Sequence, residues 1–249
     1  MIESIDILGV KVHAVTYAQV IDIINNWIVE ASPHQLATAN PEFVMAAQHN
    51  SEFYKVLNQA DLCVPDGVGL LWAARRLGRV LPERVTGSDL VPLLARESAE
   101  KGWRIYLLGA GPGVAERTSQ ILLSQNPSLR IAGVYSGSPA EADAPALVER
   151  VRLVRPDILW VAYGAPAQDL WIARHGSELG VPVMVGVGGA FDHIAGVRKR
   201  APGWIQRIHL EWLFRLITQP WRWRRQLALP QFVWAVMRQA RQSRHEKPA

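Results

Sequence analysis

The amino-acid sequence predicts an α/β fold: a mostly parallel sheet with helices on both faces, followed by a C-terminal helical appendage. Short apolar runs typical of buried strands alternate with segments of helical periodicity through most of the chain. Such alternation is typical of parallel sheets whose strands are connected by helices. Beyond a stretch containing Gly and Pro at residues 196–202, the pattern is helical only. We therefore expect an α/β domain in residues 1–196 and the appendage in residues 197–249.

Each expected element follows from its local pattern. Strands are expected at residues 5–12 with an interruption at Gly9, and at 62–64, 103–108, 130–135, 157–163 and 181–187, with a further strand that closes at Leu36-Ala37. Helices are expected at residues 16–30, 41–57 with a break near Asn50-Ser51, 70–78, 90–101, 114–124, 142–154, 169–179 and 204–218, with a further one after Pro220. Thr16 is the expected N-cap of the first helix, and Ser88 or Asp89 that of the fourth.

The composition describes a globular protein that can bury a substantial core. Of its 249 residues, 49% are hydrophobic and 20% are charged. The one cysteine, Cys63, excludes an internal disulfide and a multi-cysteine zinc site, and it suits a reducing compartment. The first residues lack the basic and then apolar pattern of a signal peptide. No apolar run approaches the roughly 18 residues that a membrane span needs.

The charge is distributed unevenly along the chain. Residues 198–249 contain 12 Lys and Arg but 2 Asp and Glu, a net charge of +10. The remainder contains 15 basic and 20 acidic residues, a net charge of −5. The same C-terminal segment holds five of the ten Trp residues. Arg and Trp together suit the interface of an anionic bilayer. The alternative is a helical pair that packs on the body or on a dimer partner.

Three polar side chains follow two strands that we expect to be neighbours. Thr38 and Asn40 lie just past the strand that closes at residue 37, and Asp66 follows the strand at residues 62–64. Ligands of open α/β sheets bind at the carboxyl ends of the strands. The simpler interpretation of Asp66-Gly67 is a surface turn, but the nearby Thr38 and Asn40 favour a ligand site.

Further candidates lie after other strands. Arg84 precedes a helix N-terminus and is either a solvated arginine or a contact for phosphate or carboxylate. Gln168 and Asp192 lie beyond the strands at residues 157–163 and 181–187, and Asp192 either serves function or caps a turn. Both are candidates for substrate binding.

The loop Gly109-Ala110-Gly111-Pro112-Gly113 stands between a strand and a helix, as in nucleotide-binding turns. A dinucleotide fingerprint requires Gly or Ala where this chain has Val114. A loop that lets its backbone approach a nucleotide at Gly109 and Gly111 is one interpretation, and a tight strand–helix turn is the other. This loop is the basis of an alternative function, an NAD(P)-dependent oxidoreductase. A nucleic-acid binder is a third possibility, but the basic tail contains no recognisable module for it.

The sequence resembles the WecG/TagA/CpsF glycosyltransferases, glycosyltransferase family 26. The matching blocks run in order from residue 38 to about residue 225: Thr38-Ala39-Asn40-Pro41-Glu42, Ala60-Asp61, Pro65-Asp66-Gly67, Arg84-Val85-Thr86-Gly87, Gly164 to Gln168, Gly186 to Asp192, Arg200-Ala201-Pro202, Leu210-Glu211-Trp212 and Arg215-Leu216. One departure is Ala167-Gln168-Asp169, where the family usually has Lys-Gln-Glu. The resemblance is specific as a set and covers most of the chain.

The resemblance implies an inverting enzyme with a Rossmann-like sheet that works without a metal or other cofactor. It implies transfer of an N-acetylmannosaminyl or related residue from a UDP-sugar to undecaprenyl-diphosphate-linked N-acetylglucosamine. The products would be teichoic acid linkage units or other cell-surface polysaccharides. The enzyme would be cytoplasmic, held peripherally on the plasma membrane by its C-terminal segment, with a possible homo-oligomer and no nucleic-acid partner.

The family pattern places Thr38 and Asp66 at catalytic positions and Arg215, Arg222 and Arg225 at the C-terminal arginine positions. The chemistry agrees, because an inverting transfer needs one base for the acceptor hydroxyl, and a carboxylate such as Asp66 can serve. The leaving diphosphate needs charge stabilisation. The chain contains no Asp-x-Asp metal motif, and arginines can supply that stabilisation.

Overall fold

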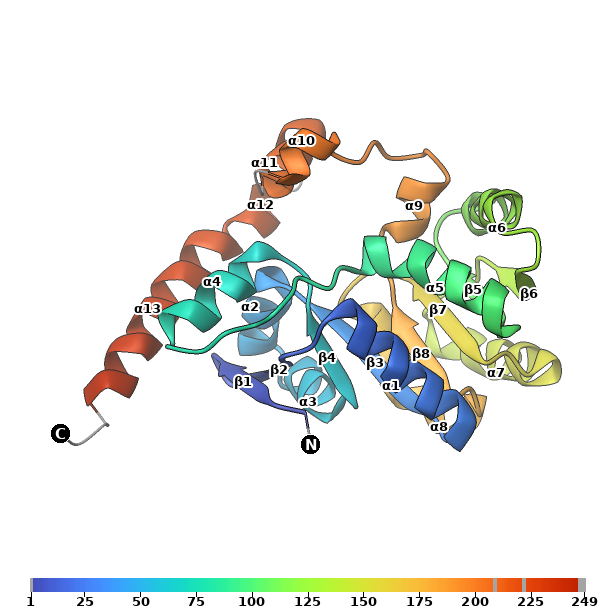
Figure 1. The fold of residues 1–249 in the computed structure, drawn as a ribbon, viewed down its shortest axis with the longest axis horizontal. Helices are drawn as coiled ribbons and strands as arrows, with labels where there is room; N and C mark the ends of the chain where they lie inside the picture. The colour runs from blue at the N-terminus through green and yellow to red at the C-terminus, as the bar shows by residue number, and fades with distance from the viewer. Residues whose placement is uncertain (1, 208–209, 221–222, 246–249) are drawn as a thin grey trace.

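A six-stranded parallel sheet forms the centre of the molecule (Figure 1). The structure is a computed structural model that describes residues 2–207, 210–220 and 223–245. The strand order is β4-β3-β8-β7-β5-β6, and every pairing in this sheet is parallel. The strands are β3 (His34–Ala39), β4 (Leu62–Pro65), β5 (Arg104–Gly109), β6 (Arg130–Tyr135), β7 (Ile158–Ala162) and β8 (Val183–Gly186). The predicted parallel sheet is thus confirmed.

The N-terminal residues form a separate antiparallel hairpin, so the strand expected at residues 5–12 is two strands that meet at the predicted interruption, Gly9. Strands β1 (Ser4–Ile7) and β2 (Val10–His13) pair with Ile5 opposite Val12. The chain turns at Leu8-Gly9, where Gly9 has a φ of 82°. Glycine adopts this left-handed conformation without the steric cost that a side chain adds, and this explains why the apolar run folds back on itself.

Helices cover both faces of the sheet, as the sequence predicts. Side chains alternate along each strand, so that Leu36 faces one helix layer and Ala37 faces the other. The first layer contains α1 (Tyr17–Glu30), α5 (Gly87–Lys101), α6 (Val114–Gln125) and α9 (Ala190–Ile194). The second contains α2 (Pro41–His49), α3 (Ser51–Gln59), α7 (Ala144–Val154) and α8 (Ala167–Leu179), with α4 (Val68–Arg76) beside α2.

One predicted helix cap is confirmed and one is wrong. Thr16 caps α1, and its side chain forms a reciprocal capping box with Gln19. Helix α5 begins earlier than expected, at Gly87, and its N-cap is Thr86 rather than Ser88 or Asp89. Thr86 Oγ1 accepts a hydrogen bond from the Asp89 N–H (3.1 Å). The earlier start brings the N-terminus of α5 next to the end of β4.

The appendage consists of α10 (Gly203–Arg207), α11 (Glu211–Thr218), α12 (Trp223–Gln226) and α13 (Ala228–His245). The helix expected at residues 204–218 is therefore two described helices. Helix α13 lies along α2 and α4 (Figure 1), where Phe232 and Val236 are fully buried in the same core cluster as the hairpin. Gln239 of α13 also accepts a hydrogen bond from the Leu8 N–H (3.0 Å). The division at residue 196 stays a prediction, but α13 shares its core with the α/β body.

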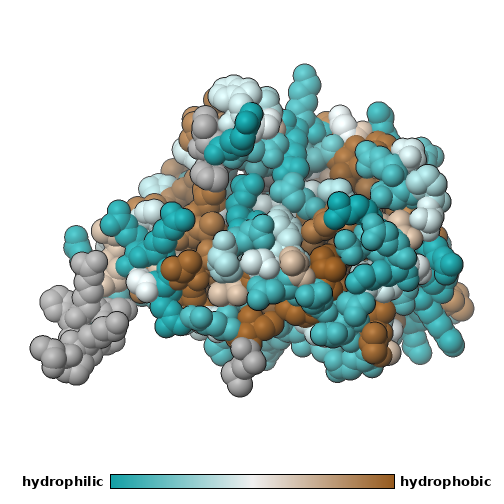
Figure 2. Space-filling model, viewed as in Figure 1, coloured by the Kyte–Doolittle hydropathy of each residue, from teal (hydrophilic) through white to brown (hydrophobic). Residues whose placement is uncertain are grey.

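Other apolar side chains of the appendage reach the surface. Nine of the sixteen exposed large hydrophobic residues in the described part of the chain lie between residues 197 and 234: Val197, Trp204, Leu210, Trp212, Ile217, Trp223, Leu227, Val233 and Trp234. In Figure 2, pale and brown residues are interspersed with teal ones at the upper left, where α10 and α11 lie. None of the described helices has the length and hydrophobicity needed to cross a membrane. Such a concentration of exposed apolar side chains is typical of an interaction surface.

Candidate active site

Thr38 and Asp66 meet at the edge of the sheet where the strands have their carboxyl ends. Strands β3 and β4 are neighbours, with Ala39 opposite Pro65, so the residues that follow them leave the sheet together. The Asp66 N–H donates to the Ala39 carbonyl (2.6 Å). Thr38 is buried, and its Oγ1 donates to the Gly186 carbonyl at the end of β8 (3.3 Å). Three strands thus contribute to one site.

Gly87, the first residue of α5, completes this centre. Its N–H donates to Asp66 Oδ2 (3.3 Å), so the carboxylate of Asp66 lies at a helix N-terminus. A Cβ atom added to Gly87 would lie 3.6 Å from Thr38 Oγ1 and 3.7 Å from the Val187 carbonyl. The backbone of Gly87 therefore faces the space between Thr38 and Asp66. Helix N-termini favour negative charge, and this position suits a carboxylate or a phosphate.

Tyr17 also belongs to this region, although no sequence pattern pointed to it. It is the first residue of α1, and its hydroxyl accepts a hydrogen bond from the Thr86 N–H (2.8 Å). Burial raises the pKa of Tyr17, and the negative charges of Asp89 and Asp66 add to the increase. Tyr17 therefore remains protonated and holds the residue that precedes Gly87.

Asn40 and Gln168 perform structural tasks beside the site. Asn40 caps α2, and its Oδ1 accepts from the Phe43 N–H (3.0 Å). Gln168 is buried, and its Oε1 accepts from the N–H groups of Gly164 (3.1 Å) and Gly188 (2.9 Å). It thus connects the loops that follow β7 and β8. These contacts organise the carboxyl edge, and a direct contact of either side chain with substrate stays a prediction.

Asp169 is a fully buried carboxyl group next to Gln168. Burial raises the pKa of Asp169 to about 7, although the neighbouring Gln168 side chain lowers it. An unfolded chain has an ordinary aspartate pKa of about 3.9. Between these values the folded protein binds the extra proton, so this group makes stability fall as pH rises through the window and level off above pH 7.

We expect Asp169→Asn to flatten this part of the pH dependence. The amide of Asn cannot ionise, so the variant avoids the cost of up to about 1.4 kcal/mol per pH unit that the carboxylate imposes. Urea unfolding at pH 5 and pH 8 measures the effect: the wild type should lose more stability than the variant. An identical pH dependence in both proteins would contradict the prediction.

The glycine loop after β5 is explained by close packing of strands. Gly109 has a φ of 101°, and a Cβ at this position would lie 2.9 Å from the Ala162 carbonyl carbon of β7. Glycine is therefore required where the ends of β5 and β7 approach each other. At Gly111 an added Cβ would make an ordinary contact with Val114 at 3.6 Å. Nucleotide binding by Gly109 and Gly111 stays a prediction.

Ion pairs connect the appendage to the carboxyl edge of the body. Arg200 contacts Asp89 (2.6 Å), Glu211 contacts Arg84 (3.9 Å), and Arg225 Nε contacts Glu42 Oε2 (3.1 Å). Asp192 on α9 pairs with Arg198 (3.2 Å) at the start of the appendage. Arg215 lies in α11, but its side chain is outside the described part of the structure, as is the whole of Arg222. Among the predicted arginines, Arg84 and Arg225 can therefore be placed.

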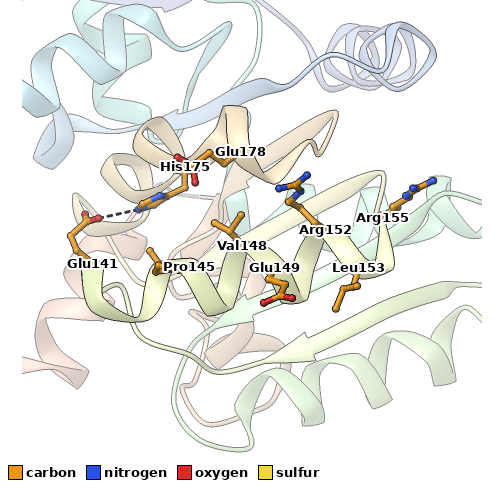
Figure 3. Close-up of a pocket in the computed structure, with 10 residues that line it drawn as sticks. Glu141, Pro145, Val148, Glu149, Arg152, Leu153, Arg155, His175 and Glu178 are labelled. Atoms are coloured by element: carbon orange, nitrogen blue, oxygen red, sulfur yellow. Dashed lines mark hydrogen bonds and ion pairs between the residues drawn. The ribbon is translucent and has the colours of Figure 1, made fainter.

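Two of the cavities in the described structure bear on the position of the site. The larger, about 840 Å³, lies between α7 and α8 and is bordered by Glu141 and His175, which are hydrogen-bonded (3.1 Å; Figure 3). None of the predicted site residues lines it. The smaller, about 430 Å³, is bordered by Glu42, Arg225 and Ala165-Pro166. Of the predicted site residues, Arg225 borders the smaller cavity, whereas Thr38 and Asp66 do not. No cluster of three or more potential metal ligands occurs among the described residues.

Polar groups at the carboxyl edge of a Rossmann-like sheet are the arrangement of α/β enzymes that bind their ligands at this edge. The model of the glycosyl transferase WecG/TagA/CpsF family matches residues 5–246. The chain belongs to this family, so it is a glycosyltransferase. The alternative of an oxidoreductase finds no support.

The chain is also similar to curated relatives along most of its length. A protein of Bacillus spizizenii is 36% identical over 84% of this chain and 80% of its own. A protein of Staphylococcus aureus is 30% identical over 98% of this chain and 96% of its own. Both relatives are named N-acetylglucosaminyldiphosphoundecaprenol N-acetyl-beta-D-mannosaminyltransferase.

Proposed function

We propose that this enzyme transfers an N-acetylmannosaminyl or related residue from a UDP-sugar to undecaprenyl-diphosphate-linked N-acetylglucosamine. The observation that carries this proposal is the similarity, over nearly the whole chain, to relatives named for that acceptor and that sugar. The convergence of Thr38, Asp66 and Gly87 at the carboxyl edge supports it. The product would enter the synthesis of a cell-surface polymer such as teichoic acid.

The proposed reaction is a single displacement with inversion. The acceptor hydroxyl oxygen attacks the anomeric carbon of the donor sugar, and its proton passes to Asp66. The bond between the anomeric carbon and the UDP oxygen breaks, and its electron pair leaves on UDP. The guanidinium of Arg225 is a described group that can stabilise the negative charge of the leaving diphosphate, while the Gly87 N–H contacts the carboxylate of Asp66. Arg215 and Arg222 are assigned to the same task, and no metal or cofactor is required.

Acceptor-dependent release of UDP tests this function. UDP-N-acetylmannosamine is incubated with enzyme, with and without a prenyl-diphosphate-N-acetylglucosamine acceptor, in the presence of EDTA. We expect release that depends on the acceptor and persists in EDTA. Release with a different UDP-sugar would change the donor but keep the reaction, and no release with any UDP-sugar would contradict the proposal. Loss of release in EDTA would contradict the metal-free mechanism.

We further propose that the enzyme works at the cytoplasmic face of the plasma membrane, attached through its appendage. The acceptor is a lipid, and the appendage combines a net charge of +10 in residues 198–249 with exposed Trp side chains. Positive charge attracts the appendage to anionic lipids, and Trp suits the interfacial zone.

Replacing two exposed tryptophans of the appendage should weaken membrane binding. We expect Trp204→Ser with Trp223→Ser to reduce sedimentation with phosphatidylglycerol vesicles by about tenfold or more, because each lost side chain removes buried apolar area. The matched control is Val29→Ser with Val80→Ser, two exposed apolar residues of the body. Equal losses in both double variants would contradict a specific membrane surface on the appendage.

A further inference from the structure

Glu42 is the body residue in contact with Arg225, the one C-terminal arginine of the predicted set whose side chain the structure describes. It follows Asn40-Pro41 in the first turn of α2, so it stands close to the carboxyl edge. Its Oε2 contacts Arg225 Nε at 3.1 Å, and its Oε1 accepts from Gln226 Nε2 at 3.4 Å. One carboxylate thus contacts two consecutive residues of α12.

The surroundings distinguish this contact from an ordinary surface ion pair. The side chain of Glu42 is 19% exposed, and its partner Gln226 is buried. The carboxylate is therefore largely shielded from solvent between α2 and α12. The side chain of Arg225 is 52% exposed, and it borders the cavity of about 430 Å³ together with the Ala165-Pro166 loop. Arg225 therefore stays accessible to a ligand while Glu42 holds its Nε.

The packing around the pair explains how Glu42 can orient Arg225. Helix α13, which follows α12, is fixed against α2 and α4 through the buried Phe232 and Val236. Helix α12 has four residues and contributes Gln226 to the buried set. The contacts of Glu42 with Arg225 and Gln226 therefore join α12 to α2, in addition to its packing on α13.

We infer that Glu42 is a positioning residue that orients Arg225 toward the diphosphate of the substrate. This inference rests on the proposed function, since it assigns Arg225 the stabilisation of the leaving UDP. Glu42 acts through Arg225 and is not itself in contact with the reacting atoms. Loss of the contact should lower the rate of transfer more than the affinity for the donor, because misplacement affects charge stabilisation in the transition state.

The first experiment measures kcat and KM for Glu42→Gln. We expect kcat to fall about 10- to 100-fold, the cost of a displaced catalytic group, with KM for the UDP-sugar little changed. The matched control is Glu52→Gln, which breaks the contact of Glu52 with Arg174 (2.7 Å) between α3 and α8. Glu42→Asp keeps the charge on a shorter side chain and should recover part of the rate. Equal rates for Glu42→Gln and the control would overturn the inference.

The second experiment tests whether Glu42 acts through Arg225. In the background of Arg225→Ala, Glu42→Gln should cause no further loss, because the two residues then form one unit. If the two substitutions lowered the rate independently, so that the double variant showed the product of the two single losses, the inference would be overturned. Hydrogen exchange of residues 223–226 provides a readout without activity, and exchange should be faster in Glu42→Gln than in the wild type. If the wild type transfers no sugar, the proposed function fails, and unchanged exchange in this segment separately overturns the role of Glu42.

Discussion

Asp66→Asn should reduce acceptor-dependent transfer by about a thousandfold, the scale of a lost general base. Asparagine has nearly the same shape as aspartate, and its side-chain oxygen can still accept the hydrogen bond from the Gly87 N–H. It cannot take a proton from the acceptor hydroxyl. The fold and donor binding should therefore be retained while turnover is lost. Steady-state kinetics together with calorimetric titration of the UDP-sugar separates the two effects.

The matched control for this variant is Asp22→Asn, which neutralises an exposed carboxylate on α1. It makes the same chemical change at an exposed position of α1 and should turn over like the wild type. Turnover of Asp66→Asn within a few-fold of the control would remove Asp66 as the base. Parallel losses of donor binding and turnover would instead assign Asp66 to substrate binding.

Phe232→Ala should destabilise the whole protein by about 3–5 kcal/mol, as large-to-small changes in a core do. Phe232 is 1% exposed and lies in the core cluster that α13 shares with the hairpin, α2 and α4. Truncation therefore removes part of the core rather than a separate tail, and a chain that ends at Gly196 should be less stable than the full chain. Urea unfolding monitored by circular dichroism measures both effects.

The neighbouring Val233 provides the control for this prediction. It is 45% exposed on the same helix, so Val233→Ala should change stability by less than about 0.5 kcal/mol. Equal stability of Phe232→Ala and Val233→Ala would show that α13 does not contribute to the core. Unchanged stability of the chain ending at residue 196 would instead support an α/β domain that folds independently.

Much of the fold could be predicted because its signals are local. Apolar runs and helical periodicity indicate the parallel sheet and its two helix layers, and the pattern at Thr16 indicates its cap. Thr38 and Asp66 could be selected because the pattern places both near strand ends, and the ends of parallel strands lie at one edge. The structure places Thr38 inside β3, one residue before its end, rather than past it. The start of α5 was predicted too late, because Thr86, Ser88 and Asp89 are all acceptable caps. In the structure Thr86 is the cap, and its N–H donates a hydrogen bond to the hydroxyl of Tyr17. Tyr17 lies 69 residues earlier in the chain, so no local pattern shows this contact.

The sequence alone determined the family, the α/β class and the strand-end position of Asp66, since each depends on residue order and short-range pattern. The tertiary structure decided which distant residues meet. It brings the Gly87 N–H to Asp66, buries Phe232 of the appendage in the core of the body, and brings Glu42 to Arg225. These contacts join segments up to about two hundred residues apart, and they depend on packing geometry, which no local pattern of residues encodes.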